Sequence, residues 1–464
     1  MPTKETGSAQ AGLKIVTGKL PDGDKDQIAS IAAQTLAPDG PKAIRYDEPA
    51  GGKHPAKSVI YSARHELVVE ALRQPDRYAL HHYDRSIPDT KFFLTSDIEE
   101  YQKRRRLIWN AFGEQRHAGK LDDFGVGAHA DQVTTMIIEQ IRARAVDRME
   151  FDILREFSVL VTYYVSARAF GVYGTRNPSL LIHVFQLLKW LQTRRKLNLT
   201  PISQEAHAVM GAAQLMIGHL FANFEQRNGL LKFLGVSAAR QLDRHIDRAV
   251  RMEADSPSGT IITELLKVKD SPALQDIPPG DIDRNIHGIL FEFVGTMVVL
   301  VGNGFAQCLH QLKRSGMSFR EVGLLMQDQP AATAFINECM RMKSPTGHLK
   351  RIASTDVELC GVPVRSGDYL SLMIPEACHD PRAFPKPDVF DPGRDPRLYI
   401  HFGPHDGPHG CLGPNWSREV IRQMFVKLGS LDALDFISGD KRGLRKAFDS
   451  EDSWPVQFVA SPPS

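Results

Sequence analysis

Helical periodicity is the feature of this sequence that most constrains its fold. Over most of residues 97–342, apolar residues recur at spacings of three and four, which places them on one face of a helix. The longest patterns of this kind cover residues 129–147, 151–170, 179–194, 205–253 and roughly 283–314, with shorter ones at 319–327, 330–342 and 414–431. They predict a mainly helical fold in which several long helices share one core.

A shorter stretch of the sequence has the pattern of strands. Residues 349–373 consist of short runs rich in β-branched residues, and Gly361 and Gly367 mark turns between them. The run SVIYSA at 58–63 predicts one more strand. The predicted fold class is therefore mainly α with a small β region.

The domain organisation follows from what the sequence lacks. No internal repeat, low-complexity tract or linker of distinct composition divides the 464 residues. We therefore expect one domain over residues 26–464. Residues 1–25 are polar, and we expect them to form a flexible N-terminal segment.

Charge and composition exclude several classes of protein. Lys and Arg number 57 against 55 Asp and Glu, and this balance argues against a protein that binds nucleic acid through phosphate contacts. Five cysteines are too few, and odd in number, for a secreted disulfide scaffold. The longest uncharged apolar run, Phe293 to Gly302, is far shorter than the ~20 residues of a membrane helix. We expect a cytoplasmic protein with no membrane anchor and no nucleic-acid partner.

A single cysteine in a glycine- and proline-rich loop is the strongest chemical signal. The loop HFGPHDGPHGCLG covers residues 401–413, and a helix is expected to begin near Pro414. A cysteine at a helix N-terminus has its thiolate stabilised by the helix dipole and by free backbone N–H groups. Such a thiolate can bind iron, and Gly407 and Gly413 would let the backbone pass close to a flat cofactor.

Two other interpretations of this loop stay open from the residues alone. A zinc site could form from four side chains, His401, His405, His409 and Cys411. No second CxxC or HxxH pair supports that site. Alternatively, Cys411 could be a buried core residue beside turn glycines.

The loop resembles the heme-binding loop of the cytochrome P450 family. Gly407, His409 and Gly413 stand four residues before, two before and two after Cys411, as in the family pattern. Phe402 stands two residues further from Cys411 than the family places its phenylalanine, so the loop carries two extra residues within 404–406. The resemblance implies a single-domain cytochrome P450 fold and heme b (iron protoporphyrin IX), with Cys411 as the axial iron ligand.

Two further motifs resemble the family in the expected order. Glu338 and Arg341 match the Glu-x-x-Arg of its K helix, and three residues of spacing puts both on one helix face. The family completes a buried cluster with a third residue, which here is Arg394 of FDPGR. The resemblance implies that these three residues form a structural cluster.

The resemblance also implies which residues hold the heme propionates. HLKRIAST at 348–355 resembles the family strand that supplies an arginine, here Arg351. Residues 99–112 resemble its C helix, where Tyr101 and Arg105 take the places of a frequent His-x-x-x-Arg pair. Both side chains can donate hydrogen bonds to a carboxylate. His409 completes the predicted set.

The long periodic helix lacks the family's usual acid–threonine pair. That threonine commonly lies about 35 residues before the glutamate of Glu-x-x-Arg, and this count leads to Gly302 and Asn303. Thr296, which follows Gly295, would lie two turns too early and has no acid beside it. We therefore expect Asn303 to face the bound oxygen, with Gln307 four residues further on the same helix face.

This substitution leaves two reactions open for a heme-thiolate oxidoreductase acting on an apolar small molecule, a lipid or a natural product. An amide beside the heme resembles the hydroperoxide-isomerising branch of the family, which includes allene oxide synthases and fungal fatty-acid diol synthases. Such an enzyme uses a peroxide and needs no electron donor. The alternative is a conventional NAD(P)H-dependent monooxygenase that receives electrons through a ferredoxin and a reductase.

Overall fold

The computed structural model describes residues 4–5, 12–21, 24–50, 56–80, 98–112, 125–143, 148–172, 201–220, 229–437, 445–447, 450–453 and 455–459. The predicted helix at 179–194 lies outside these residues. Helices dominate the described chain, which confirms the predicted mainly helical fold. No helix among the described residues is long and apolar enough to cross a membrane.

A helix lies within or close to each predicted segment that the structure describes, although the 205–253 pattern is described as two helices and residues 151–152 belong to a strand. The described helices are more numerous than those predicted. They are α1 (Lys25–Leu36), α2 (His65–Arg73), α4 (Ile98–Phe112), α6 (Val126–Ala143), α7 (Val159–Phe170), α9 (Pro201–Leu220), α10 (Gly229–Asp255), α11 (Ile261–Lys267), α12 (Pro279–Ser315), α13 (Phe319–Leu325), α14 (Gln329–Met342), α15 (Ile374–Ala377) and α16 (Pro414–Leu428). A π-helical segment, η2 (Ile153–Ser158), leads into α7, and two 3₁₀ turns are η3 (Pro272–Leu274) and η4 (Pro396–Leu398).

The main sheet has seven strands in the order β1-β2-β3-β4-β10-β7-β5. They are β1 (Lys4–Glu5), β2 (Leu13–Thr17), β3 (Ala43–Glu48), β4 (Lys57–Ser62), β5 (Tyr78–Ala79), β7 (Leu349–Ala353) and β10 (Tyr369–Leu372). β4 runs parallel to β10, with Val59 opposite Tyr369, and β10 runs antiparallel to β7. The strands predicted at 58–63 and within 349–373 are therefore confirmed.

Smaller sheets complete the strand content. One joins β6 (Arg148–Asp152), β11 (Asp435–Phe436) and β14 (Pro455–Val459). Two hairpins pair β8 (Val357–Leu359) with β9 (Val362–Val364) and β12 (Arg445–Ala447) with β13 (Ser450–Ser453).

The expectation of a flexible segment over residues 1–25 is wrong for its described C-terminal part. β2 pairs in parallel with β3 over its full length. Leu13, Val16 and Leu20 are buried, with 3%, 6% and 3% of their surfaces exposed. The polar composition misled the prediction because a few apolar side chains in a short strand suffice to anchor it when sheet and helix neighbours cover them.

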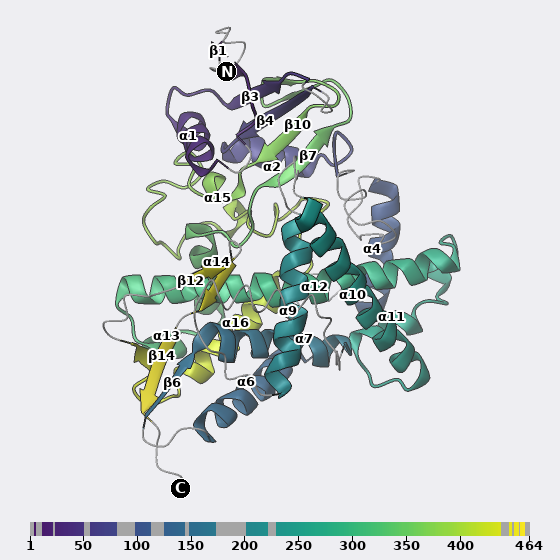
Figure 1. Ribbon diagram of the computed structural model, residues 1–464, viewed down its shortest axis with the longest axis vertical. Coiled ribbons are helices and arrows are strands. Elements are labelled where there is room, and N and C mark those ends of the chain that lie inside the picture. The colour runs from purple at the N-terminus through teal and green to yellow at the C-terminus, as the bar shows by residue number, and fades with distance from the viewer. Residues whose placement is uncertain are drawn as a thin grey trace.

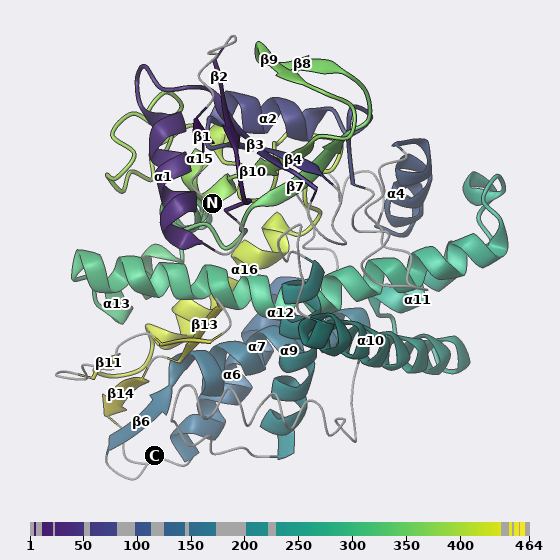
Figure 2. The same cartoon turned by 45° about the horizontal axis from the view of Figure 1, so that its top comes forward.

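The long helix α12 organises the molecule. Figures 1 and 2 show the main sheet with α1 and α2 at one end of the molecule and α12 crossing beneath it. α6, α7 and α9 lie on the other side of α12 in Figure 2, and α16 packs against α6, α12 and α13. Buried residues of α12, α14 and α16 belong to one large apolar cluster. The loop before α16 is therefore connected to a helix that is packed into the core.

Candidate functional site

Cys411 lies at the start of α16 with its sulfur held by the backbone. The Gly413 N–H donates to Cys411 Sγ at 3.3 Å, and the Cys411 N–H donates to the Phe402 carbonyl at 3.0 Å. Cys411 is exposed, while Cys308, Cys339 and Cys378 are buried. A sulfur that is exposed and accepts a backbone N–H at a helix start is suited to bind a metal as a thiolate.

The two extra residues of the loop lie at its outer tip. There the Arg73 Nε of α2 donates to Asp406 Oδ1 at 2.9 Å, and both side chains are about half exposed or more, at 49% and 62%. Gly403, with φ of 81°, makes the turn that opens this tip. The extension therefore projects away from Cys411 and leaves its backbone contacts in place.

α12 meets the cysteine loop at Met297. A Cβ placed on Gly413 would lie 3.1 Å from Met297 Cε and 3.9 Å from Cys411 Sγ, so the absence of a side chain at Gly413 gives Met297 room beside the loop. Gly295 and Thr296 directly precede Met297 and lie at the same level of the helix. Sequence reasoning had set Thr296 aside as two turns too early.

Asn303 and Gln307 follow Met297 along α12. Asn303 lies six residues after Met297, about 9 Å further along the helix axis. Its neighbour Gly304 packs toward α14 and α16, where a Cβ would lie 2.4 Å from Met340 Cε and 3.2 Å from the Ile421 side chain. α12 continues to Ser315, and α13 begins at Phe319.

Gln307 lies a further turn beyond the level of Cys411. Only 5% of its surface is exposed, and its Oε1 atom has no hydrogen-bond partner among the described residues. Gln307 lies on a buried side of α12 and takes no part in the contact between Met297 and the cysteine loop.

The four residues predicted to hold propionates come together at one place. The Arg105 Nη1 donates to the Tyr101 hydroxyl at 2.6 Å and to the Pro408 carbonyl at 2.7 Å. The Tyr101 and His409 rings lie 4.2 Å apart. Burial, together with the charges of Arg351 and Arg105, lowers the pKa of His409 to about 3. Three separate segments of the chain thus supply one cationic cluster.

This cluster fits the carboxylates of heme. Both ring nitrogens of His409 are buried without a hydrogen-bond partner in the described part of the chain. A carboxylate beside the ring would accept a hydrogen bond from it and would be attracted by the guanidinium groups of Arg105 and Arg351. Cys411 lies two residues away with its sulfur exposed. The donor set therefore suits a cofactor that carries both carboxylates and a thiolate-binding metal.

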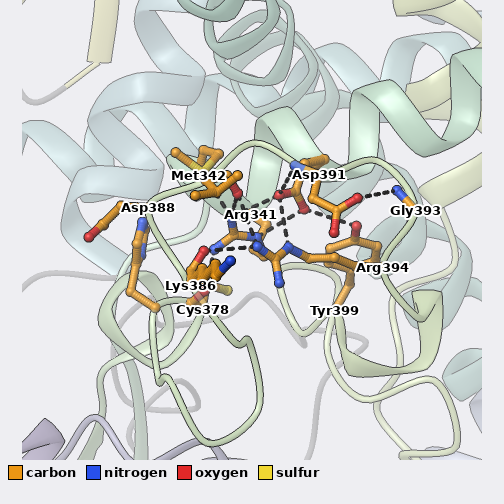
Figure 3. A network of polar contacts seen from close by, with 12 residues as sticks. Arg341, Met342, Cys378, Lys386, Asp388, Asp391, Gly393, Arg394 and Tyr399 are labelled. Carbon is orange, nitrogen blue, oxygen red and sulfur yellow. Dashed lines mark hydrogen bonds and ion pairs between the residues drawn. The ribbon is translucent and has the colours of Figure 1, made fainter.

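Glu338 lies at the centre of a buried polar network (Figure 3). Arg341 donates to its carboxylate through Nη2 at 2.8 Å and Nε at 2.9 Å, and Arg394 Nε donates at 3.2 Å. The Asp391 N–H and the Tyr399 hydroxyl each donate at 3.0 Å. The Glu338 and Arg341 side chains are fully buried, and five hydrogen bonds compensate the desolvated carboxylate.

The electrostatics of this network keep Glu338 ionised. Burial on its own would raise the pKa of Glu338, but the hydrogen bonds from Arg341 and the Asp391 backbone outweigh it and hold the pKa below its ordinary value. Arg341 also donates to the Cys378 carbonyl at 2.9 Å, which fixes α14 to the segment after α15. The network joins α14 to the loop that leads to Cys411.

Sequence reasoning missed Tyr399 as a member of this network. Replacing Tyr399 with phenylalanine removes one donor to an ionised, buried oxygen, and hydrogen bonds to charged groups contribute about 1.5–3 kcal/mol. We expect the free energy of unfolding to fall by about that amount, measured by chemical denaturation. The visible spectrum of the cofactor-loaded protein should not change, and an unchanged denaturation midpoint would contradict the assignment.

The four residues of the zinc alternative do not converge. Within the described part of the chain, no three His, Cys, Asp or Glu side chains are arranged to hold a metal ion. His401 is buried against Tyr399 and Phe402, with ring centroids 5.6 and 4.8 Å away, whereas His405 is exposed.

Comparison with known proteins agrees with this site. Residues 325–428 match the family model for Cytochrome P450. Over 186 residues the chain is 38% identical to the biotin biosynthesis cytochrome P450 of Bacillus subtilis (strain 168), covering 39% of this chain and 44% of that protein. Over 143 residues it is 33% identical to a bifunctional dioxygenase–epoxy alcohol synthase of Pyricularia oryzae, covering 28% of this chain and 12% of that protein.

The fold agrees over nearly the whole chain. The crystal structure of P450BioI in complex with acyl carrier protein ligated to hexadec-9Z-enoic acid superposes with a TM-score of 0.66 at 17% identity, covering 94% of this chain and 98% of that one. The chain spans less than half the length of each of these two curated relatives. The matched segment contains Glu338, Arg341, Arg394 and Cys411. Residues 325–428 therefore match the cytochrome P450 family, the chain shares the fold of a solved cytochrome P450, and the cofactor is heme b.

Proposed function

We propose that the chain is a heme-thiolate monooxygenase that hydroxylates an apolar small molecule, with Cys411 as the iron ligand. The observation that carries the proposal is the contact between Met297 of α12 and Gly413. This contact supports a role for Thr296, rather than Asn303, beside the reacting oxygen. A threonine hydroxyl can both donate and accept a hydrogen bond, which suits an oxygen that must be protonated.

The residues of the chain would act in three ways. Bound heme with a thiolate ligand supplies the oxidising chemistry, because the thiolate favours O–O cleavage. The Gly413 N–H steadies the sulfur, and the cluster around His409 would hold the propionates. Gly295 stands where an acid commonly precedes the threonine, so Thr296 would orient a water that delivers the proton.

The substrate and partner are inferred from the relatives. A biotin biosynthesis enzyme and a structure with a fatty acyl chain on acyl carrier protein are among the proteins similar to this chain. They support a lipid or other long apolar molecule as substrate. A monooxygenase of this kind would receive electrons from NAD(P)H through a reductase and a ferredoxin in the cytoplasm.

A second candidate function is the rearrangement or use of a hydroperoxide. The similarity to a dioxygenase–epoxy alcohol synthase favours it, as does the amide of Asn303. In such an enzyme Asn303 would position the peroxide oxygen by a hydrogen bond. The position of Asn303 beyond Met297 argues against this assignment.

Two variants of α12 distinguish the candidates. We expect Thr296→Val to lower NAD(P)H-dependent product formation by about 10²-fold, the lower end of what proton transfer contributes. Asn303→Ala should keep nearly full activity and heme content. The measurement is product formed from a panel of fatty acids with a ferredoxin and reductase.

The same proteins are then mixed with lipid hydroperoxides under anaerobic conditions and without reductant. Rapid turnover that Asn303→Ala abolishes and Thr296→Val spares would overturn the monooxygenase proposal. No hydroperoxide turnover, alongside hydroxylation that depends on NAD(P)H, would support it.

A further inference from the structure

Arg418 of α16 lies beneath the cysteine loop. Its guanidinium carbon is 5.3 Å from the centre of the Phe402 ring, a distance typical of a cation–π contact. The carbonyl of Phe402 accepts the Cys411 N–H at 3.0 Å. Arg418 therefore packs against the residue that fixes the backbone of the proposed iron ligand.

The hydrogen bonds of Arg418 go to neutral groups. Its Nε donates to Asn337 Oδ1 of α14 at 2.8 Å, and its Nη1 donates to Asn415 Oδ1 at 3.1 Å. In the part of the chain that the structure describes, no carboxylate forms an ion pair with it. One turn further along α16, Arg422 pairs with Glu419 at 2.7 Å. The charge of Arg418 is thus held in place without being neutralised.

The thiolate of Cys411 is the negative charge that acts on the Arg418 guanidinium. Burial lowers the pKa of Arg418 to about 10, and the Cys411 thiolate raises it in opposition. At this value the guanidinium stays protonated at neutral pH. The sulfur and the cation therefore attract each other electrostatically, and the cation is the buried partner of the two.

We propose that Arg418 is a positioning residue for the Cys411 sulfur and that its unneutralised charge raises the reduction potential of the bound heme. The proposal rests on the assignment of Cys411 as the iron ligand. Reduction of the iron adds one negative charge to the cofactor and its ligand. A fixed cation nearby stabilises the reduced form more than the oxidised form, so it shifts the equilibrium toward reduction.

Asn337 determines how much of that charge the heme experiences. An amide oxygen orients the guanidinium without cancelling its charge. A carboxylate of the same shape at this position would keep the hydrogen bond and neutralise the cation. Asn337→Asp is therefore the most specific variant, because it changes one charge and leaves Arg418 and its packing in place.

The experiment measures the reduction potential of the holoprotein by spectroelectrochemical titration. We expect Asn337→Asp and Arg418→Gln each to lower the reduction equilibrium constant roughly tenfold, which is about 59 mV for one electron. Arg418→Lys keeps the charge and should shift the constant by less. Arg422→Gln serves as the distance control, because it removes the same unit of charge one turn further along α16, and it should shift the potential by less than Arg418→Gln.

Equal potentials for the wild-type protein and Asn337→Asp, with the thiolate spectrum intact, would overturn the proposal. If Arg418→Gln fails to bind heme, Asn337→Asp decides alone. The spectrum of the ferrous–carbon monoxide complex shows independently whether each variant keeps its thiolate ligand. A failure of the Cys411 assignment is therefore distinguishable from a failure of the Arg418 proposal.

Discussion

Replacing Cys411 with serine is expected to abolish the thiolate spectrum of the heme protein and all of its oxidative activity. The sulfur of Cys411 is exposed at the start of α16 and accepts the Gly413 N–H at 3.3 Å. A serine hydroxyl at this position is a much weaker iron ligand and does not supply the electron density that a thiolate does. The measurement is the ferrous–carbon monoxide difference spectrum of the purified protein.

Cys360→Ser is the matched control for this experiment. Cys360 is partly exposed in the turn between β8 and β9, and it should keep the full thiolate spectrum when replaced. Retention of that spectrum in Cys411→Ser would show that another cysteine binds the iron. Cys308 and Cys339 are poor alternatives because both are buried inside helices, and burial raises the pKa of Cys339 well above its ordinary value.

Replacing Glu338 with alanine is expected to reduce stability by about 3–5 kcal/mol, because Arg341 would be left buried and unneutralised. Both side chains are fully buried, and Arg394 and Tyr399 would also lose their shared acceptor. We expect a large fall in the free energy of unfolding and in heme content. Chemical denaturation and the heme-to-protein ratio measure the two effects.

The control for this prediction is a pair with the same helical spacing at the surface. Glu264 and Lys267 lie three residues apart on α11 with 31% and 62% of their side chains exposed. Glu264→Ala should change stability by less than about 1 kcal/mol. An equal, small effect of Glu338→Ala would show that its network does not stabilise the fold.

The pH dependence of stability follows from the same carboxylate. The pKa of Glu338 is lower in the folded protein than its ordinary value. Its contribution is therefore complete above the ordinary glutamate pKa of about 4.3 and is lost as the pH falls through the lower, folded value. The free energy of unfolding should therefore fall less steeply on acidification in Glu338→Gln than in the wild-type protein. Chemical denaturation at a series of pH values measures this difference.

Local patterns predicted most of the fold, because the periods of helices and strands depend on neighbouring residues. The helix at α16 and the strands β7 and β10 follow directly from such patterns. β2 was missed, because what stabilises that strand is its pairing with β3 and the neighbours that bury Leu13 and Val16. Tertiary neighbours of this kind have no signature in a short polar segment.

The register of α12 could not be read from the sequence for a different reason. The predicted segment at roughly 283–314 agrees with α12, which ends at Ser315, but the sequence does not show which of its residues lies against the cysteine loop. The contact of Met297 with Gly413 depends on how two distant helices pack. Thr296 could have been kept as a candidate because it is the hydroxyl residue of that apolar segment.

Tyr399 and Arg418 show which site residues sequence reasoning overlooks. Tyr399 reaches Glu338 from across the fold and has no spacing motif of its own. Arg418 did have a usable signal. It is a cation in the first two turns of the helix that directly follows the cysteine loop.

The pairing of β4 with β10 determines when this protein can complete its main sheet during synthesis. Lys57–Ser62 of β4 finds its parallel partner only at Tyr369–Leu372, so about two thirds of the chain must be translated between the two strands. Closing so long a loop is entropically costly and slow. The edge of β4 therefore remains open while the helical part emerges from the ribosome. Cys411 comes later still, so the nascent chain acquires its proposed iron ligand only after the sheet can close.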